Sequence, residues 1–296
     1  NITGQSFSSA GASVGSRSRM GRTGNLPGGL PVVAFGSTNY LVAWQDNGAT
    51  GERTYAQRVS VTSTLQGSAI AVASRSSAAL GFAPPGVAYG ASEFLVVWND
   101  DRSGNYDVYG RMVSPDGTLG SEIAIATGTP KQCEPAVAYD GTKFLVVWEH
   151  QTSTSPETWD VYGTLVTSSG TAGPAFKINQ VSSPSFNPTS VAFDGVNFLV
   201  VWHRDVNGGS PNPNKWDLHG RLVTMAGAVT GEELDIATES GSQAMPKMAC
   251  GGGATLVVWS DGLFDGGAYT ARGRFFDRAG QPLGEEFEPF SDRKVV

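Results

Sequence analysis

The sequence contains few charged residues and no concentration of positive charge. Charged residues make up 16% of its 296 residues, the formal net charge is −7 and the sequence pI is near 5.0. Nowhere do Lys and Arg form a run that could neutralise successive phosphates. Nucleic acid is therefore not expected as a partner.

Long apolar runs are also missing. The longest, such as Phe94–Trp98, have five residues, whereas a helix that spans a membrane needs roughly 20. We therefore expect no membrane span. The chain begins at Asn1 without a Met or an apolar signal segment, which fits either a removed leader or excision from a longer chain. Few lysines, an acidic balance and abundant Ser, Thr, Gly and Asn favour an extracellular or cell-surface location.

A tryptophan that ends an apolar run recurs along the chain. The run reads Leu-Val-Ala-Trp or Leu-Val-Val-Trp, and it ends at Trp44, Trp98, Trp148, Trp202 and Trp259, at intervals of 54, 50, 54 and 57 residues. A second short apolar run precedes each of these. In the third and fourth repeats the two runs are separated by Asp140-Gly141 and Asp194-Gly195, a dipeptide that favours a tight hairpin turn. Because both runs are apolar at nearly every position, both faces of the hairpin must be covered by other protein.

Two further strands are expected after each tryptophan, marked by glycines at regular spacing. The spacing recurs at Gly110, Gly117 and Gly120, at Gly163, Gly170 and Gly173, at Gly220, Gly227 and Gly231, and at Gly273, Gly280 and Gly284, with Ala56, Ser63 and Gly67 in the first repeat. Four strands per repeat of roughly 40 to 50 residues are typical of a propeller blade rather than of a solenoid coil.

The predicted fold is therefore all-β, a β-propeller of four-stranded antiparallel blades. We expect five blades, with six blades, one of them incomplete or strand-exchanged, as the alternative. The chain would form a single domain, residues 1–296, with a half repeat at residues 1–25 and blades at residues 26–74, 75–127, 128–180, 181–238 and 239–296.

The N-terminus carries the half repeat. Gly4, Gly11 and Gly15 fit the glycine spacing, so residues 2–20 are predicted to be the third and fourth strands of a repeat that lacks the first two. They could complete the last blade and clasp a five-bladed ring, overlie an edge, or belong to an incomplete sixth blade. We favour the clasped ring, because Pro289 weakens the claim of the last predicted strand to a central position.

One segment resembles a known family. The residues Phe94-Leu-Val-Val-Trp98-Asn-Asp100-Asp-Arg102-Ser-Gly104-Asn-Tyr106-Asp107-Val-Tyr109, followed by Ser114-Pro-Asp116-Gly117, resemble the WD40-like (PD40-like) repeat of bacterial secreted TolB-type propellers. That family has Ser-Pro-Asp-Gly before the strand pair, whereas here it stands once, after the third strand. The resemblance implies a propeller with a binding or scaffolding role, and propeller lectins are similar only in architecture.

Two series of side chains are candidate sites. Acidic residues follow the tryptophans: Asp46, Asp100, Glu149, Asp205 and Asp261. They could bind a cation at the channel, with Ca²⁺ the only cofactor considered, or supply a glycosidase carboxylate pair; loop capping is the structural alternative. Aromatic–polar pairs precede the third strand: Tyr106-Asp107, Trp159-Asp160, Trp216-Asp217 and Tyr269-Thr270. Such pairs could bind a sugar ring, and packing between blades is the structural alternative.

Histidine and cysteine offer little further chemistry. His150 and His203 follow equivalent tryptophans, but two histidines without a third ligand make a weak case for zinc. Cys133 and Cys250 lie at non-equivalent repeat positions, and we expect free buried thiols. The chain also lacks an Asp-box series, a sialidase-type arginine triad and the Asn-Asp-Pro opening of some five-bladed glycosidases.

These features lead to three hypotheses of function. The main expectation is a non-catalytic binding module of the cell exterior, with glycan or protein ligands engaged by rim loops. One alternative is a glycoside-active enzyme with carboxylates at the propeller channel. The other is a structural subunit of a surface assembly, in which terminal strands pair with another subunit's edge.

Overall fold

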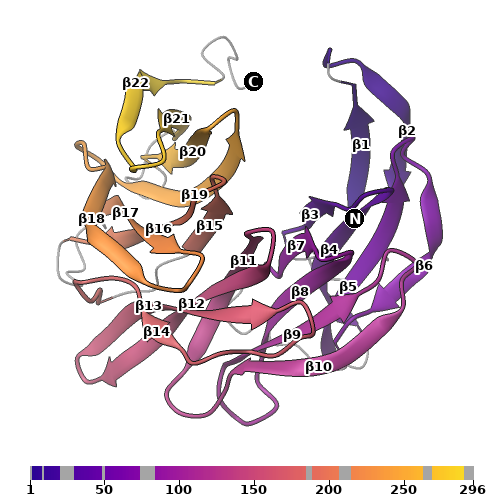
Figure 1. Cartoon of the computed structure of the whole chain (residues 1–296), viewed down its shortest axis with the longest axis horizontal. Helices are drawn as coiled ribbons and strands as arrows, with labels where there is room; N and C mark the ends of the chain where they lie inside the picture. Colours follow the sequence, from indigo (N-terminus) through magenta and orange to yellow (C-terminus); the bar gives the residue numbers. More distant parts are fainter. Residues whose placement is uncertain are drawn as a thin grey trace. The chain divides into compact units, whose positions relative to one another are not determined.

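The computed structural model consists of antiparallel β-sheets, and it describes residues 2–8, 10–20, 30–48, 51–73, 84–184, 189–206, 215–262 and 269–289. Within these ranges there is no helix, and so no helix that could cross a membrane. Five sheets have four strands each, in sequence order. This is the architecture of a five-bladed β-propeller, as the repeats predict (Figure 1).

The blades contain the following strands. Blade 1 is β3 (Val32–Phe35), β4 (Asn39–Gly48), β5 (Gly51–Ser60) and β6 (Leu65–Ala71); blade 2 is β7 (Gly86–Gly90), β8 (Glu93–Asp100), β9 (Asp107–Val113) and β10 (Leu119–Ala126); blade 3 is β11 (Gln132–Tyr139), β12 (Lys143–Thr154), β13 (Glu157–Thr167) and β14 (Phe176–Lys177); blade 4 is β15 (Thr189–Phe193), β16 (Asn197–Asp205), β17 (Trp216–Thr224) and β18 (Val229–Ala237); blade 5 is β19 (Gln243–Gly251), β20 (Ala254–Asp261), β21 (Thr270–Phe276) and β22 (Pro282–Phe287). A separate two-stranded sheet pairs β1 (Thr3–Phe7) with β2 (Ser13–Arg19).

The chain forms two compact units. Residues 1–146 and 165–173 make one, and residues 147–164 and 174–296 make the other. Within the first unit the first strands of neighbouring blades contact each other, β3 with β7 and β7 with β11, and within the second β15 contacts β19. The first strand of each blade is therefore its inner strand.

The hairpin between the first and second strands forms for local reasons. In blade 4 the Asp194 carboxylate accepts hydrogen bonds from the backbone N–H groups of Val196 and Asn197 at 2.7 and 2.8 Å, and Gly195 has a φ of 96°. Left-handed backbone of this kind costs glycine little. The Asp-Gly dipeptides thus build the hairpins that the sequence predicts.

The second strands are buried on both faces, as their continuous apolar runs require. In blade 2 every residue from Phe94 to Trp98 is 0% exposed. Phe94, Val96 and Trp98 pack with Leu41 and Ala43 of blade 1 in one hydrophobic cluster. Alternate residues of a strand point to opposite faces, so this register leaves Leu95 and Val97 for the other side of the sheet.

Two expectations need correction. The N-terminal strands do not complete the last blade, because β21 and β22 already fill the third and fourth positions of blade 5. Cys133 and Cys250 are free as expected, and Cys133 is buried, but Cys250 is exposed. Cys250 lies near the end of β19, where the residues of the strand are exposed.

Candidate functional site

The five predicted carboxylates do not share one position relative to the repeated tryptophan. Asp46, Asp100 and Asp261 stand two residues after it, Glu149 one residue after it and Asp205 three residues after it. Because successive side chains of a strand point to opposite faces, Glu149 lies on the other face of its sheet from the one that Asp100 occupies in blade 2. The side chain of Asp46 lies outside the described residues.

Asp100 is held in an ion pair. The Arg102 guanidinium donates to its carboxylate from Nε at 2.8 Å and from Nη2 at 2.5 Å, and the backbone N–H of Arg102 donates at 2.9 Å. The side-chain hydrogen bonds to Asp100 raise the pKa of Arg102. Arg102 also bonds Glu122 at 2.7 Å and lies 4.3 Å from the ring centroid of Tyr109. Asp100 therefore has a structural partner on each oxygen.

The remaining carboxylates of this series are also buried or paired. Asp261 forms an ion pair with Arg272, with Nε 2.9 Å from the carboxylate, and accepts a hydrogen bond from Gln243 Nε2 at 3.0 Å. Glu149 is 0% exposed and Asp205 is 7% exposed. Within the described residues, no three His, Cys, Asp or Glu side chains come together in a way that could hold a metal ion.

The four aromatic residues before the third strands share a sequence slot but not an environment. Trp159 is 0% exposed, and its backbone exchanges two hydrogen bonds with Ser183 at 2.7 and 2.9 Å. Trp216 is half-buried and stacks on His203, with ring centroids 4.4 Å apart. Tyr269 is 61% exposed, and Tyr106 is half-buried. Trp159 is thus core, and Tyr106 and Tyr269 remain accessible.

The acidic residues that follow three of these aromatics serve the strand ends. Asp107 accepts from Ser103 Oγ at 2.7 Å and from the backbone N–H of Gly128 at 2.9 Å. Asp160 accepts from Asn179 Nδ2 at 2.9 Å and pairs with Lys177 at 2.8 Å. Both are 3% exposed or less. Asp217, 7% exposed, lies 3.4 Å from Lys215 Nζ. These three acidic residues connect the start of their third strands to neighbouring segments of the same polypeptide.

His150 and His203 are packed against aromatic rings. His150 lies 4.4 Å from Tyr162 between ring centroids, and burial lowers the pKa of His150. His203 is the residue stacked on Trp216. Each ring therefore has a packing role within its own blade.

Blade 2 carries a polar pocket of about 290 Å³. The loop between β8 and β9 supplies Asp101, Gly104, Asn105 and Tyr106, and Lys131 supplies the facing wall from the segment before β11. Lys131 Nζ lies 5.9 Å from the Tyr106 ring centroid. The Asn105 side chain donates to Gly128 O at 2.9 Å, and the backbone N–H of Gln132 donates to Tyr106 O at 2.7 Å. A fixed frame thus presents an aromatic ring, a carboxylate and an ammonium to solvent.

Glu134 is a carboxylate that the sequence patterns did not single out. It is half-buried near the start of β11, has a φ of 52°, and donates its backbone N–H to Asn99 Oδ1 at 3.0 Å. Met245 near the start of β19 has a φ of 56°, and each of the two precedes a proline. The left-handed backbone therefore recurs in the repeat, whereas the carboxylate does not. The sequence signal that could have identified Glu134 is an acidic residue directly before the proline of an inner strand.

The fold, rather than the sequence, relates this chain to known proteins. No protein-family model and no curated protein matches it, so the resemblance to TolB-type repeats has no family evidence behind it. A protein of unknown function from Dyadobacter fermentans is 10% identical with a TM-score of 0.62, covering 88% of this chain and 82% of that one. A thermostable family-43 glycoside hydrolase is 13% identical with a TM-score of 0.53, covering 88% and 94%. An α-L-arabinofuranosidase from Lactobacillus brevis is 10% identical with a TM-score of 0.51, covering 85% and 92%.

These likenesses establish a shared fold, and they correct the main expectation of function. The leading hypothesis of a non-catalytic binding module is wrong. Two of the similar structures, which match this chain over more than nine tenths of their own length, are described as enzymes that act on glycosides. The repeated aromatics that led to that hypothesis are partly core, as Trp159 shows. The glycoside-active alternative fits the findings better.

Proposed function

We propose that this protein is a glycoside-active enzyme that works outside the cell on a polysaccharide. The observation that carries the proposal is Glu134, a half-buried carboxylate on an inner strand of a propeller whose fold is shared with two enzymes that act on glycosides. Propellers bind their ligands at strand ends and loops, which the rigid scaffold holds in place. Glu134 stands at such a strand end.

Symmetry supports the choice of Glu134. Repeat positions with a structural role keep similar chemistry, whereas catalysis requires a difference between blades. The backbone at Glu134 and at Met245 is alike, yet only Glu134 can exchange a proton. Asp100 and Asp261 each form an ion pair with an arginine of the same blade.

The polar pocket of blade 2 is the proposed substrate-binding surface, and Lys131 of its lining stands three residues before Glu134 in the chain. A sugar ring needs an apolar face to stack its C–H groups and polar neighbours for its hydroxyls. Tyr106 provides the ring, and Asp101, Asn105 and Lys131 provide the polar groups. In the proposal, Glu134 acts as a general acid or base and Asp101 helps to hold the substrate.

The test is hydrolysis of a panel of arabinans, aryl arabinofuranosides and xylans by the full chain, read as released reducing ends. Glu134→Gln removes the proton-transferring group with little change in shape, and we expect kcat to fall roughly 100-fold to 10,000-fold. Glu285→Gln is the matched control, because Glu285 is exposed on the outermost strand of blade 5. Asp101→Asn should raise KM more than it lowers kcat.

Thermal melts of all three variants separate chemistry from folding. If Glu134→Gln melts as the parent does and keeps its activity, the assignment of Glu134 is wrong. If the folded parent protein cleaves no member of the panel and binds none of them by calorimetry, the glycoside-active proposal fails.

A further inference from the structure

The polar pocket of blade 2 lies between two chain segments that are bonded to each other. Asn105 Nδ2, in the loop between β8 and β9, donates to Gly128 O at 2.9 Å. The backbone N–H of Gln132, at the start of β11, donates to Tyr106 O at 2.7 Å. All five residues that line the pocket belong to the first compact unit. The shape of the pocket is therefore set within that unit.

Blades 3 and 4 each pair a lysine with the aspartate at the start of the third strand. In blade 3, Lys177 Nζ lies 2.8 Å from Asp160, and in blade 4, Lys215 Nζ lies 3.4 Å from Asp217. Both aspartates are 7% exposed or less, and a buried carboxylate needs a partner of this kind. These two lysines therefore stabilise the fold.

Blade 2 satisfies the equivalent aspartate without a lysine. Asp107 Oδ2 accepts from Ser103 Oγ at 2.7 Å, and Asp107 Oδ1 accepts from the backbone N–H of Gly128 at 2.9 Å. In the part of the chain that the structure describes, Lys131 makes no ion pair, and its Nζ lies 5.9 Å from the Tyr106 ring centroid. That distance is at the outer limit of a cation–π contact. The half-buried Lys131 ammonium is thus available to a ligand in the pocket.

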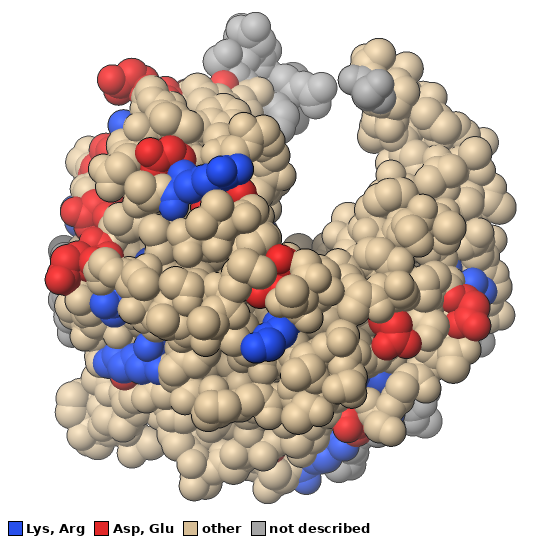
Figure 2. All heavy atoms as spheres, in the orientation of Figure 1, with Lys and Arg blue, Asp and Glu red and all other residues tan. Residues whose placement is uncertain are grey.

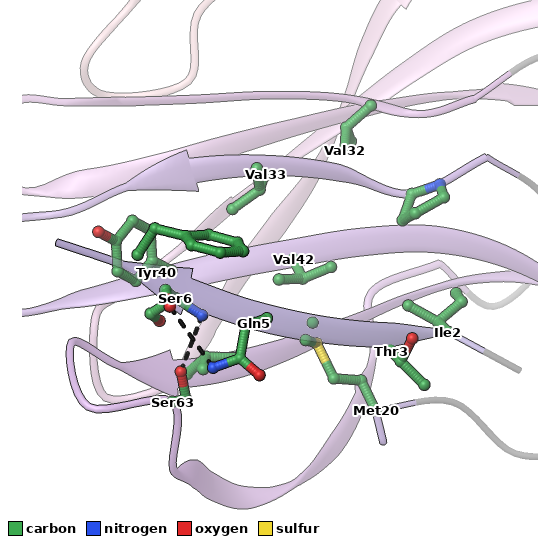
Figure 3. Close-up of a pocket in the computed structure, with 14 residues that line it drawn as sticks. Ile2, Thr3, Gln5, Ser6, Met20, Val32, Val33, Tyr40, Val42 and Ser63 are labelled. Carbon is green, nitrogen blue, oxygen red and sulfur yellow. Dashed lines mark hydrogen bonds between the residues drawn. The ribbon is translucent and has the colours of Figure 1, made fainter. Parts of the chain in front are cut away.

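The pocket between β1 and blade 1 has a different character. Its volume is about 310 Å³, and uncharged residues such as Ile2 and Val42 form its lining (Figure 3). The Gln5 amide in that lining already donates to the carbonyl oxygens of Val14 and Gly15 at 3.0 Å each. Recognition of a charged ligand is therefore a property of the blade 2 pocket rather than of this one.

A sugar that carries a carboxylate matches the blade 2 pocket. Its ring can stack C–H groups on Tyr106, and its carboxylate can accept a charge-assisted hydrogen bond from Lys131. The volume of about 290 Å³ is near the lower end for ligand pockets, roughly 300 Å³, which suits a single sugar unit. The exposed Asp101 lines the same pocket and would repel a second carboxylate. The arrangement therefore favours one acidic unit on a neutral chain.

We propose that this pocket binds a uronic acid unit of an otherwise neutral polysaccharide, and that Lys131 is the residue that selects it. The proposal rests on the proposed glycoside-active function and narrows its substrate to polysaccharides that carry isolated acidic units. The carboxylate of the uronic acid accepts from Lys131 Nζ while the sugar ring lies on Tyr106. Because Lys131 stands three residues before Glu134, one segment carries both the selecting ammonium and the proposed proton-transferring group.

Binding measured apart from cleavage tests the proposal. The probe is a xylo-oligosaccharide with one glucuronic acid branch, and the reference ligand is its carboxyl-reduced form, in which the branch is glucose. Both are titrated by calorimetry into the full chain, as the parent protein and as Glu134→Gln, which should bind without cleaving. We expect the acidic ligand to bind about tenfold more tightly than the reduced one, because it adds a hydrogen bond between charged groups.

Three lysine variants locate the source of that preference. Lys131→Gln should bring the two affinities together, and Lys131→Arg should keep most of the difference. Lys143→Gln is the matched control, because Lys143 is also half-buried but follows the turn at the far end of β11; it should keep the full preference. No binding of either ligand, equal affinity of the parent for both, or a preference that survives Lys131→Gln would overturn the proposal.

The same experiment separates this proposal from the proposed function. Cleavage of neutral polysaccharides without any preference for the acidic ligand would refute the uronic acid site and leave the glycoside-active function standing. The preference without cleavage of any polysaccharide would support the uronic acid site and count against an enzyme.

Discussion

Arg102→Met tests whether the carboxylate after the repeated tryptophan is a structural group. Asp100 is 0% exposed and has Arg102 as its partner at 2.5 Å. The substitution keeps the aliphatic stem and removes the charge, so the carboxylate retains the backbone N–H of residue 102 at 2.9 Å and Trp98 Nε1 at 3.4 Å. Removing one member of a buried ion pair costs about 3–5 kcal/mol. Because the Arg102 side chain is 29% exposed, water can reach the vacated space, and we expect the lower end, about 3 kcal/mol.

The assay is urea unfolding of the full chain, followed by tryptophan fluorescence and by circular dichroism. The companion variant Asp100→Asn/Arg102→Met removes the stranded charge and should recover about 1–2 kcal/mol of the loss. Glu122 keeps Arg111 as a partner at 3.2 Å in both variants, so its own loss is the same in each. A cost below about 1 kcal/mol for Arg102→Met would place the pair among exposed ion pairs and refute the structural assignment of Asp100.

Three further outcomes are expected. Stability should fall as the pH drops below about 6.5: burial lowers the pKa of His219 in the folded protein, with Arg204 adding to the effect, so the unfolded state takes up protons first. Unfolding free energies from pH 8 to pH 5 check this, and His219→Gln should flatten the slope. Trp159→Ala should cost about 3–5 kcal/mol in urea unfolding, because Trp159 is 0% exposed; a loss below 1 kcal/mol would contradict its core position. Glu134→Gly and Met245→Gly should each raise stability by up to about 1 kcal/mol by relieving left-handed backbone, and only Glu134→Gly should abolish glycoside cleavage.

Local chemistry explains what the sequence predicted well. A hairpin turn depends on two or three adjacent residues, so Asp194-Gly195 identifies it without knowledge of the rest of the chain. Burial of both faces follows from a continuous apolar run, as Phe94–Trp98 shows. The spacing of glycines likewise fixed the outer strands, because left-handed turn residues recur where the glycines do. These features together specify a blade.

The candidate sites depended on information that spacing does not carry. Tyr106, Trp159 and Tyr269 occupy one slot, yet Trp159 is 0% and Tyr269 61% exposed. The burial of Trp159 depends on a segment more distant in the sequence, since the backbone of Ser183 pairs with that of Trp159. The carboxylates also differ in their placement, because a shift of one residue along a strand moves a side chain to the opposite face, which separates Glu149 from Asp100.

Charge placement supports the same division between scaffold and site. On the face shown in Figure 2, the described acidic and basic side chains are scattered and several lie side by side, with no continuous basic patch. Pairs such as Arg204 with Glu233 at 2.6 Å join strands within one blade. A carboxylate in such an ion pair is a poor general acid or base, because the opposite charge favours its ionised form.

A repeated fold limits where a single chemical site can arise. Every blade needs the same tryptophan, turns and covered faces, so packing determines which side chains those positions can carry. Glu134 and Met245 show where a position is free of that demand: the backbone there is alike, and an acidic and an apolar side chain are both accepted. Function in such a fold should therefore be sought where equivalent positions share their geometry and differ in their side chains.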